Sequence, residues 1–451
     1  MKIFNWFRQK RGGINGSLIS AFSTLLLSKI EALDASNVAD FGTAWISLLR
    51  MKSLTEWLMW GALILLVAFN AIFEITRIHL SRVELSPSFY DVMKKYTADS
   101  IVDSLSDGII AWGEGKTVCC SSAIIEGWRS EDVIVSTYDN AMYHFACKKE
   151  NKKMYGKKSF YFLNKEYKKY VRSEEFQKII HEGNNLTRVM LKDCCMNFDP
   201  KNRKLLLDLA KTEWSQTTYV WNKFGKKKGE ELEPTSLMGE YSKGITSGTN
   251  SERYLPNSFC MHLIIETLDN KIIKSRISQN KKNDNAGTWA FSLGKQIAIE
   301  DFCDGKDLKD NFVKNWMKRA FQEEYRLSEN DYMNIVEEKS LRILSVNFES
   351  DRYNFAMVCT VRLNYCYDTF YNQVAPLLST EEAIELGFIE LKEIPSILFS
   401  YLQKDQRALY HPSSYLRLLL FYMHRSGVAR AERQIVKLDQ KMMQCHTDEL
   451  T

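Results

Sequence analysis

Proline is scarce in this chain, and cysteine never occurs in a paired metal-binding pattern. Only 7 of the 451 residues are Pro, whereas 45% are hydrophobic and 26% are charged. These proportions exclude a disordered, collagen-like or low-complexity protein. The 10 Cys residues are scattered and include no C-x-x-C, so a disulfide scaffold and a zinc ribbon are both disfavoured. Free thiols in a reducing compartment are the expectation that follows.

The sequence also has little net charge. Lys and Arg number 61 and Asp and Glu 56, which leaves a formal charge of +5. A dedicated nucleic-acid binder usually concentrates far more basic charge on one face, so this class is disfavoured. The length allows about three units of roughly 150 residues each.

Two uncharged stretches near the N-terminus predict a membrane anchor. As a helix, residues 57–73 would span about 26 Å, close to the ~30 Å hydrocarbon core of a bilayer. Trp57 and Trp60 suit the membrane interface. Residues 12–28 are more polar, but small residues recur at every fourth position, which favours close helix packing in lipid. These residues are Gly16, Ser20, Thr24 and Ser28. The alternative for 12–28 is an amphipathic helix on the membrane surface.

The charges around these stretches predict an orientation. The first 11 residues carry four basic side chains and no acid, and the connector 29–56 carries three basic and four acidic ones. Because basic residues favour the cytoplasmic side, both termini are expected there, with the chain in the inner membrane as a two-span protein.

Composition divides the chain into five predicted parts. A linker is expected where apolar residues are few and breakers many. The parts are a two-helix membrane anchor (1–82), a mixed α/β region (83–225), a linker (226–256), a compact domain (257–405) and a helical extension (406–451).

The domain at 257–405 has the clearest secondary-structure pattern. It predicts a hairpin from strands at 259–268 and 271–277, because Asp269 and Asn270 suit a turn between them. An extended segment should follow at 288–294 and then a helix at 308–325. Further strands are predicted at 341–348 and 354–363, with helices near 380–385 and 394–403. Outside this domain, the apolar spacing of 205–220 favours a helix.

The predicted helix at 308–325 carries the informative motif. Arg319-Ala-Phe-Gln-Glu-Glu-Tyr-Arg-Leu327 resembles the second half of a Nudix box, G-x5-E-x7-R-E-U-x-E-E-x-G-U, in which U is bulky and apolar. By spacing, Gly305 falls on the first box glycine. However, Trp289-x-Phe-Ser-Leu-Gly294 resembles the strand and glycine that come directly before such a box. Gly294 is therefore taken as its equivalent, with an enlarged loop before the helix.

Several box positions have lost their usual residue. Pyrophosphate hydrolysis usually needs Mg²⁺ held by carboxylates, and glutamates at i, i+3 and i+4 share a helix face. Asn311 and Ala320 stand where acids would be, and Arg326 replaces the second glycine. Glu323 and Glu324 remain as candidate metal ligands, with a solvated helix face or a salt bridge to Arg319 as the alternative.

The predicted site follows from these matches. Asp304 and Asp307 could replace the lost acids, although no spacing requires it. The resemblance implies Mg²⁺ as cofactor if any is bound, and catalytic residues stay open. The candidate ligand-binding residues are Trp289, Gly294 and Arg319.

A two-helix anchor, a cytoplasmic region and a degenerate Nudix-like domain together resemble the transmembrane-Nudix effectors of bacterial anti-phage systems that signal by cyclic oligonucleotides (CBASS). The resemblance implies a membrane-anchored α+β fold with two transmembrane helices, a mixed α/β middle region and a C-terminal Nudix-like α/β/α sandwich. It also implies a cyclic oligonucleotide ligand made by a partner nucleotidyltransferase (cyclase), homo-oligomers, contact with membrane lipid, and killing of infected cells by membrane disruption. A membrane-tethered Nudix hydrolase of nucleoside diphosphate derivatives is the alternative, and a membrane scaffold without a small ligand is a third possibility.

Overall fold

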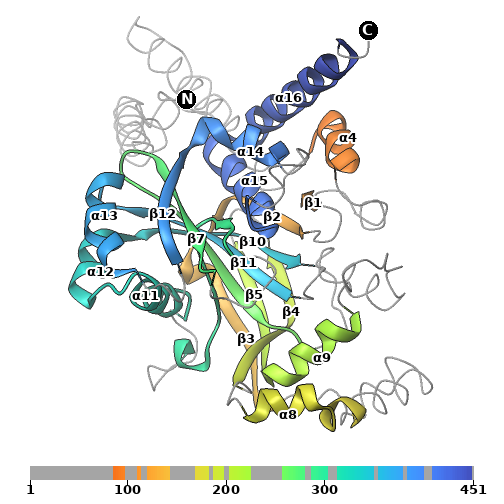
Figure 1. Ribbon diagram of the computed structural model, residues 1–451, viewed down its shortest axis with the longest axis vertical. Coiled ribbons are helices and arrows are strands. Elements are labelled where there is room, and N and C mark those ends of the chain that lie inside the picture. Colours follow the sequence, from red (N-terminus) through yellow and green to blue (C-terminus); the bar gives the residue numbers. More distant parts are fainter. Residues whose placement is uncertain are drawn as a thin grey trace, which may run out of the picture. The chain divides into compact units, whose positions relative to one another are not determined.

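A computed structural model of the chain (Figure 1) places twelve stretches of the sequence, all within the compact unit Leu80–Thr451. The described residues are 85–96, 109–112, 119–142, 168–181, 186–197, 203–224, 256–279, 286–302, 312–349, 354–378, 383–400 and 409–448.

Nine of the described strands form one mixed sheet. Its central pair, β11 and β6, is parallel, and the other neighbours are antiparallel. The order is β1 (Ile109–Trp112), β2 (Cys119–Trp128), β10 (Val336–Glu349), β11 (Asn354–Leu363), β6 (Phe259–Glu266), β7 (Lys271–Ile277) and β12 (Ala383–Glu390). Two short strands complete it: β8 (Trp289–Ala290) pairs with β7, and β9 (Leu293–Gln296) pairs with β6.

A second, three-stranded sheet is built from the middle of the chain. In it β5 lies between β3, to which it is parallel, and β4, to which it is antiparallel. Its strands are β3 (Val133–Met142), β5 (Lys204–Glu213) and β4 (Thr187–Asn197). The helices α8 (Glu174–His181) and α9 (Trp214–Phe224) belong to the same region.

Helices cover both faces of the larger sheet. In Figure 1 the helices α11, α12 and α13 lie together on one side, whereas α15 packs on β1, β2 and β10. Their bounds are α11 (Phe312–Glu324), α12 (Glu329–Ile335), α13 (Tyr367–Val374), α14 (Ile394–Ser400), α15 (Ser413–Ser426) and α16 (Val428–Asp448). The short 3-10 helices are η2 (Ser130–Asp132), η3 (Ile299–Phe302), η4 (Ala375–Leu377) and η5 (Leu391–Glu393).

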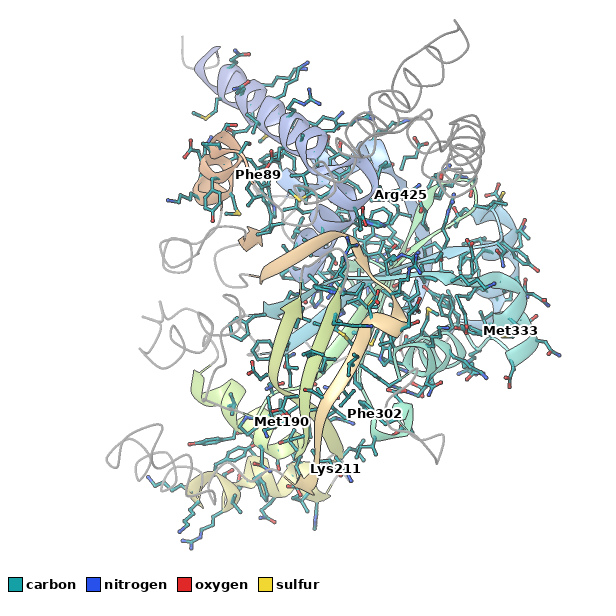
Figure 2. The ribbon with its side chains drawn as sticks, turned by 180° about the vertical axis from the view of Figure 1, so that it is seen from behind. Phe89, Met190, Lys211, Phe302, Met333 and Arg425 are labelled. Carbon is teal, nitrogen blue, oxygen red and sulfur yellow. The ribbon has the colours of Figure 1, made fainter. Side chains whose placement is uncertain are left out.

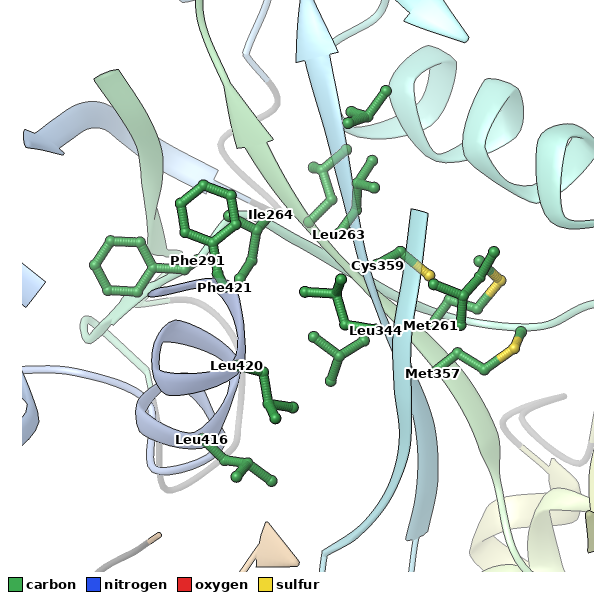
Figure 3. Packing of buried hydrophobic residues seen from close by; sticks show 14 of the residues in the cluster. Met261, Leu263, Ile264, Phe291, Leu344, Met357, Cys359, Leu416, Leu420 and Phe421 are labelled. Atoms are coloured by element: carbon green, nitrogen blue, oxygen red, sulfur yellow. The ribbon is translucent and has the colours of Figure 1, made fainter. Parts of the chain in front are cut away.

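The central strands are apolar because both of their faces are buried. Nearly every residue of β11 and β6 is buried, as expected for strands covered on both sides. In Figure 3, Ile264 and Phe291 lie with Phe421 of α15, while Met261 and Met357 lie on the other side of the strands. Successive side chains on a strand point to opposite faces, so the two helix layers receive alternate residues of the same strands.

The N-terminal helix of the described part is attached to the C-terminal one. Figure 2 shows Phe89 of α4 (Pro87–Tyr96) beside α16. Lys95 forms an ion pair with Asp439 at 2.8 Å, and the Ser86 amide donates to Glu432 Oε1 at 2.9 Å. Residues nearly 350 positions apart in sequence therefore meet in one unit.

The predicted fold class is wrong. The described residues form mixed α+β sheets, and none of their helices is long and apolar enough to cross a membrane. The two predicted spans, 12–28 and 57–73, lie outside the described residues. Strand β2, from the predicted middle region 83–225, pairs with β10, from the predicted domain 257–405. Strand pairing over a long sequence separation leaves no local pattern, which is why it was missed.

Several predicted elements are confirmed and two are corrected. The β6–β7 hairpin, the box helix and the C-terminal helices are present. Of the predicted helix near 380–385, the described residues 383–385 belong instead to the edge strand β12. The predicted helix at 205–220 is divided into strand β5 and helix α9. The strand part was misread because its alternating burial is overlaid by extra apolar residues such as Leu206 and Ala210.

Candidate functional site

The box helix α11 has one buried stripe and one charged edge. Its buried side chains include Phe312, Trp316, Ala320 and Phe321. Ala320, at the position of a box acid, is fully buried. The other predicted replacements, Asn311, Asp304 and Asp307, lie outside the described residues, as does Gly305.

The helix ends in a backbone conformation that suits the box. Arg326, at the position of the second box glycine, has a φ of 52°. This left-handed region is one that glycine enters freely and most other residues avoid. The chain has thus kept the turn after the helix while losing the residue that favours it.

Arg319 is held by a buried carboxylate next to the helix. Its Nε and Nη2 donate to the two oxygens of Asp301, each at 2.7 Å. Nη2 also donates to the Gln296 carbonyl at 3.0 Å. Asp301 is only 1% exposed and also accepts a hydrogen bond from the Ala298 amide at 2.8 Å. Planar, two-point pairs of this kind are among the strongest charged hydrogen bonds, so Arg319 fixes η3 against α11.

Lys295 contacts both remaining box glutamates. Its ammonium forms an ion pair with Glu323, and its Nζ lies 3.1 Å from Glu324 Oε1. Glu323 also faces Arg319, one helical turn away, with Nη1 to Oε2 at 3.3 Å. The salt bridge to Arg319, one alternative to a metal-ligand role, is therefore present for Glu323.

These contacts favour the charged forms of Lys295, Glu323 and Arg319. Burial alone would lower the pKa of Lys295, but Glu324 and Glu323 hold it above its usual value. Burial would likewise raise the pKa of Glu323, but Lys295 and Arg319 hold it below its usual value. Asp301 outweighs the burial of Arg319 and raises the pKa of that guanidinium. All three side chains are consequently charged near neutral pH.

The described residues of this group do not fit a divalent metal ion. A Mg²⁺ site needs several oxygen ligands without a competing cation. Here Lys295 already contacts Glu323 and Glu324, Arg319 contacts both oxygens of Asp301, and Ala320 supplies no donor. Among the described residues no group of three or more His, Cys, Asp or Glu is placed to hold a metal.

Gly294 faces the opposite side of the sheet from this charged group. It pairs with His262 of β6, and a Cβ at position 294 would lie 2.6 Å from His262 Nδ1. His262 Nε2 is 3.2 Å from Nη2 of Arg417 on α15 and 3.4 Å from Glu349 Oε1. Burial alone would raise the pKa of Glu349, but His262 and Arg417 hold it well below its usual range. Gly294 therefore makes room for a buried polar group that attaches α15 to the sheet.

Trp289 lies in a third place, next to β7. The Lys274 ammonium lies over its ring, 4.5 Å from the centroid, and 5.9 Å from the ring of Tyr410. Gly387 of β12 leaves room for the Lys274 side chain, since a Cβ there would lie 2.9 Å from Lys274 Cε. An aromatic plane beside an ammonium can accept a base and a phosphate.

The structure thus brings together only part of the predicted site. Arg319, Glu323 and Glu324 form one group, whereas Gly294 belongs to the opposite face and Trp289 contacts Lys274 and the segment around Tyr410. Sequence reasoning missed Lys295. Its signal was its place directly after Gly294, because alternation on a strand directs these two residues to opposite faces.

No family model and no curated protein matches this sequence. Part of the chain is similar to two solved structures. One is DR0079 from Deinococcus radiodurans, with 12% identity and a TM-score of 0.22 over 34% of this chain and 83% of that one. The other is a MutT protein from Methanosarcina mazei Go1, with 19% identity and a TM-score of 0.21 over 40% of this chain and 95% of that one. Likenesses at this level assign neither a ligand nor an activity to this chain.

Proposed function

We propose that the domain around α11 is a divergent Nudix-like module that binds a phosphorylated nucleotide without hydrolysing it. The observation that carries the proposal is the burial of Ala320. The box acid is replaced by a methyl group that is fully enclosed by the core, between Trp316 and Glu324 on the same helix stripe. A carboxylate cannot be supplied from this position without burying a charge.

The ligand class follows from the charges and rings that remain. Lys274 and Trp289 offer an ammonium and an aromatic plane where β8 pairs with β7, and base stacking on such a plane contributes about 1–3 kcal/mol. The resemblance to CBASS effectors makes a cyclic oligonucleotide the first ligand to test. The cyclase partner, the homo-oligomer, the lipid contact, the inner-membrane location and the role in anti-phage immunity stay predictions of that resemblance.

Binding and turnover can be measured on the same protein. The full chain is titrated by calorimetry with a panel of cyclic di- and trinucleotides and their linear counterparts. It is then incubated with nucleoside diphosphate derivatives in Mg²⁺ or Mn²⁺, and products are separated by chromatography. We expect saturable binding of at least one nucleotide and no turnover. Trp289→Leu should weaken binding by roughly 5- to 150-fold, the equivalent of one lost stacking contact.

A matched aromatic serves as the control. Tyr371 on α13 is 39% exposed and stacks only loosely with Tyr367, so Tyr371→Leu should leave binding unchanged. Turnover that disappears in Glu323→Gln or Glu324→Gln would replace the receptor proposal by the hydrolase alternative. Failure of the folded chain to bind any nucleotide of the panel would favour the scaffold.

A further inference from the structure

We propose that Lys295 is a built-in cation that stands in place of a divalent metal ion between Glu323 and Glu324. The box is then metal-independent, and a nucleotide bound at Lys274 and Trp289 needs no metal ion between Glu323 and Glu324. The inference rests on the proposed function for the nature of that ligand only. The claim about the cation concerns the protein alone and can be tested without the ligand.

The position of Lys295 is fixed by strand pairing. It lies on β9 opposite Met261 of β6, on the face that α11 covers. From there its Nζ reaches carboxylate oxygens of two consecutive residues at the end of the helix, 3.1 Å from Glu324 and closer to Glu323. One positive centre that bridges two box glutamates has the arrangement that a metal ion would have there.

The Lys295 ammonium leaves no favourable place for a second cation between the glutamates. Lys295 and Arg319 face three carboxylates, those of Asp301, Glu323 and Glu324. Both cations are mostly buried, with 20% and 18% of their side chains exposed. A divalent ion between the glutamates would lie against the Lys295 ammonium, and like charges at such a distance repel strongly in a partly buried site.

Among the residues that the structure describes, no substitute ligand set lies around the pair. The oxygens of Asp301 already accept from Arg319 and from the Ala298 amide. Ala320 has no donor atom and no exposed surface. Glu323 and Glu324 become ligands for a metal only if the Lys295 ammonium leaves them.

A simpler role for Lys295 is a structural one, in which its ion pairs hold β9 against α11. Both roles predict that removal of the ammonium costs stability. They differ in what the freed carboxylates do. If Lys295 stands in place of a metal ion, its removal lets a divalent cation bind between Glu323 and Glu324, whereas a purely structural ion pair predicts no such binding. A gain of metal binding on removal of Lys295 therefore separates the two.

The test is a Mn²⁺ titration of the full chain. Binding is measured by calorimetry and by the loss of the electron paramagnetic resonance signal of free Mn²⁺. The variants are Lys295→Met and a control, Lys318→Met. Lys318 is also a lysine that contacts a single surface glutamate, Glu329, at 2.5 Å. We expect no specific Mn²⁺ site in the parent or in Lys318→Met. Lys295→Met should bind one equivalent at least about tenfold more tightly than either.

Further variants keep the outcome decisive. Lys295→Arg retains the positive charge and should bind no Mn²⁺. If Lys295→Met does not fold, Lys295→Gln keeps a polar chain of similar length, and its melting temperature with Mn²⁺ against EDTA gives the same answer. A stoichiometric Mn²⁺ site in the parent overturns the inference, and so does a folded Lys295→Met or Lys295→Gln that binds none. Nucleotide binding by the parent in EDTA is measured separately, and its absence would overturn the proposed function without changing the metal result.

Discussion

Gly294 shows how one residue can match a motif for a reason other than ligand binding. In the resemblance it is the equivalent of the first box glycine and a candidate ligand-binding residue. In the structure the His262 ring occupies the space that a side chain at position 294 would take. Glu349 and Arg417 hold this ring in place. The glycine is needed for packing between two strands, and this need follows from a contact that no local pattern records.

Gly294→Ala should therefore destabilise the protein. The added methyl would lie 2.6 Å from His262 Nδ1, so the ring must move away from Glu349 and Arg417. Overpacking of this kind costs about 1–3 kcal/mol, measurable as a shift of the urea midpoint. The control is the same substitution in a His262→Ala background, where the clash is absent and the cost should largely disappear. An equal cost in both backgrounds would show that His262 is not the reason.

At the scale of secondary-structure elements, much of the fold could be predicted from the sequence. The β6–β7 hairpin has an apolar strand and an Asp-Asn turn, and the box helix has an apolar stripe with Arg319 and Glu323 at its edge. The edge strand β12 was missed because half of its residues are exposed and its glutamates suit a helix. Lys295 was missed because its meaning depends on which helix covers its face of the sheet.

The attachment of α15 to the sheet is a second feature beyond the reach of local patterns. Arg417 is 3.8 Å from Glu349 and 3.2 Å from His262, and it also contacts Ser413 within its own helix. The side chains of Arg417 and Glu349 are 4% and 6% exposed. A buried pair of this kind fixes the position of an element, because either charge alone would be costly to bury.

Arg417→Leu should for this reason be strongly destabilising. It removes the guanidinium from the buried Glu349 carboxylate and leaves His262 beside it. Removal of one partner of a buried pair typically costs about 3–5 kcal/mol. Urea unfolding followed by circular dichroism measures the loss. The double variant with Glu349→Gln should cost clearly less than the sum of the two single variants, because no uncompensated charge remains. Additive costs would mean that the two side chains do not act as a pair.

At the scale of the whole molecule, the larger sheet joins segments that the sequence divides by a linker. Trp112 of β1 donates from Nε1 to the Leu398 carbonyl at 3.0 Å and meets the Phe399 ring edge-on, 5.5 Å between centroids. β2 pairs with β10, and α15 covers both strands. The segment 257–405 therefore depends on chain that lies before and after it.

A fragment of residues 257–405 should for this reason fail to fold cooperatively. It keeps the box helix and the β6–β7 hairpin but loses β2 and α15, which leaves the edge of β10 unpaired and the apolar face beneath α15 exposed. Unpaired apolar edges of this kind promote aggregation. Fragment 85–448 should unfold in one urea transition, with tryptophan fluorescence and circular dichroism changing together. Fragment 257–448 contains α15 but lacks β2. Its stability should lie between those of fragments 257–405 and 85–448. A cooperative transition of 257–405 at the midpoint of 85–448 would show that the linker separates two independent folding units and that the β2–β10 pairing adds nothing to stability.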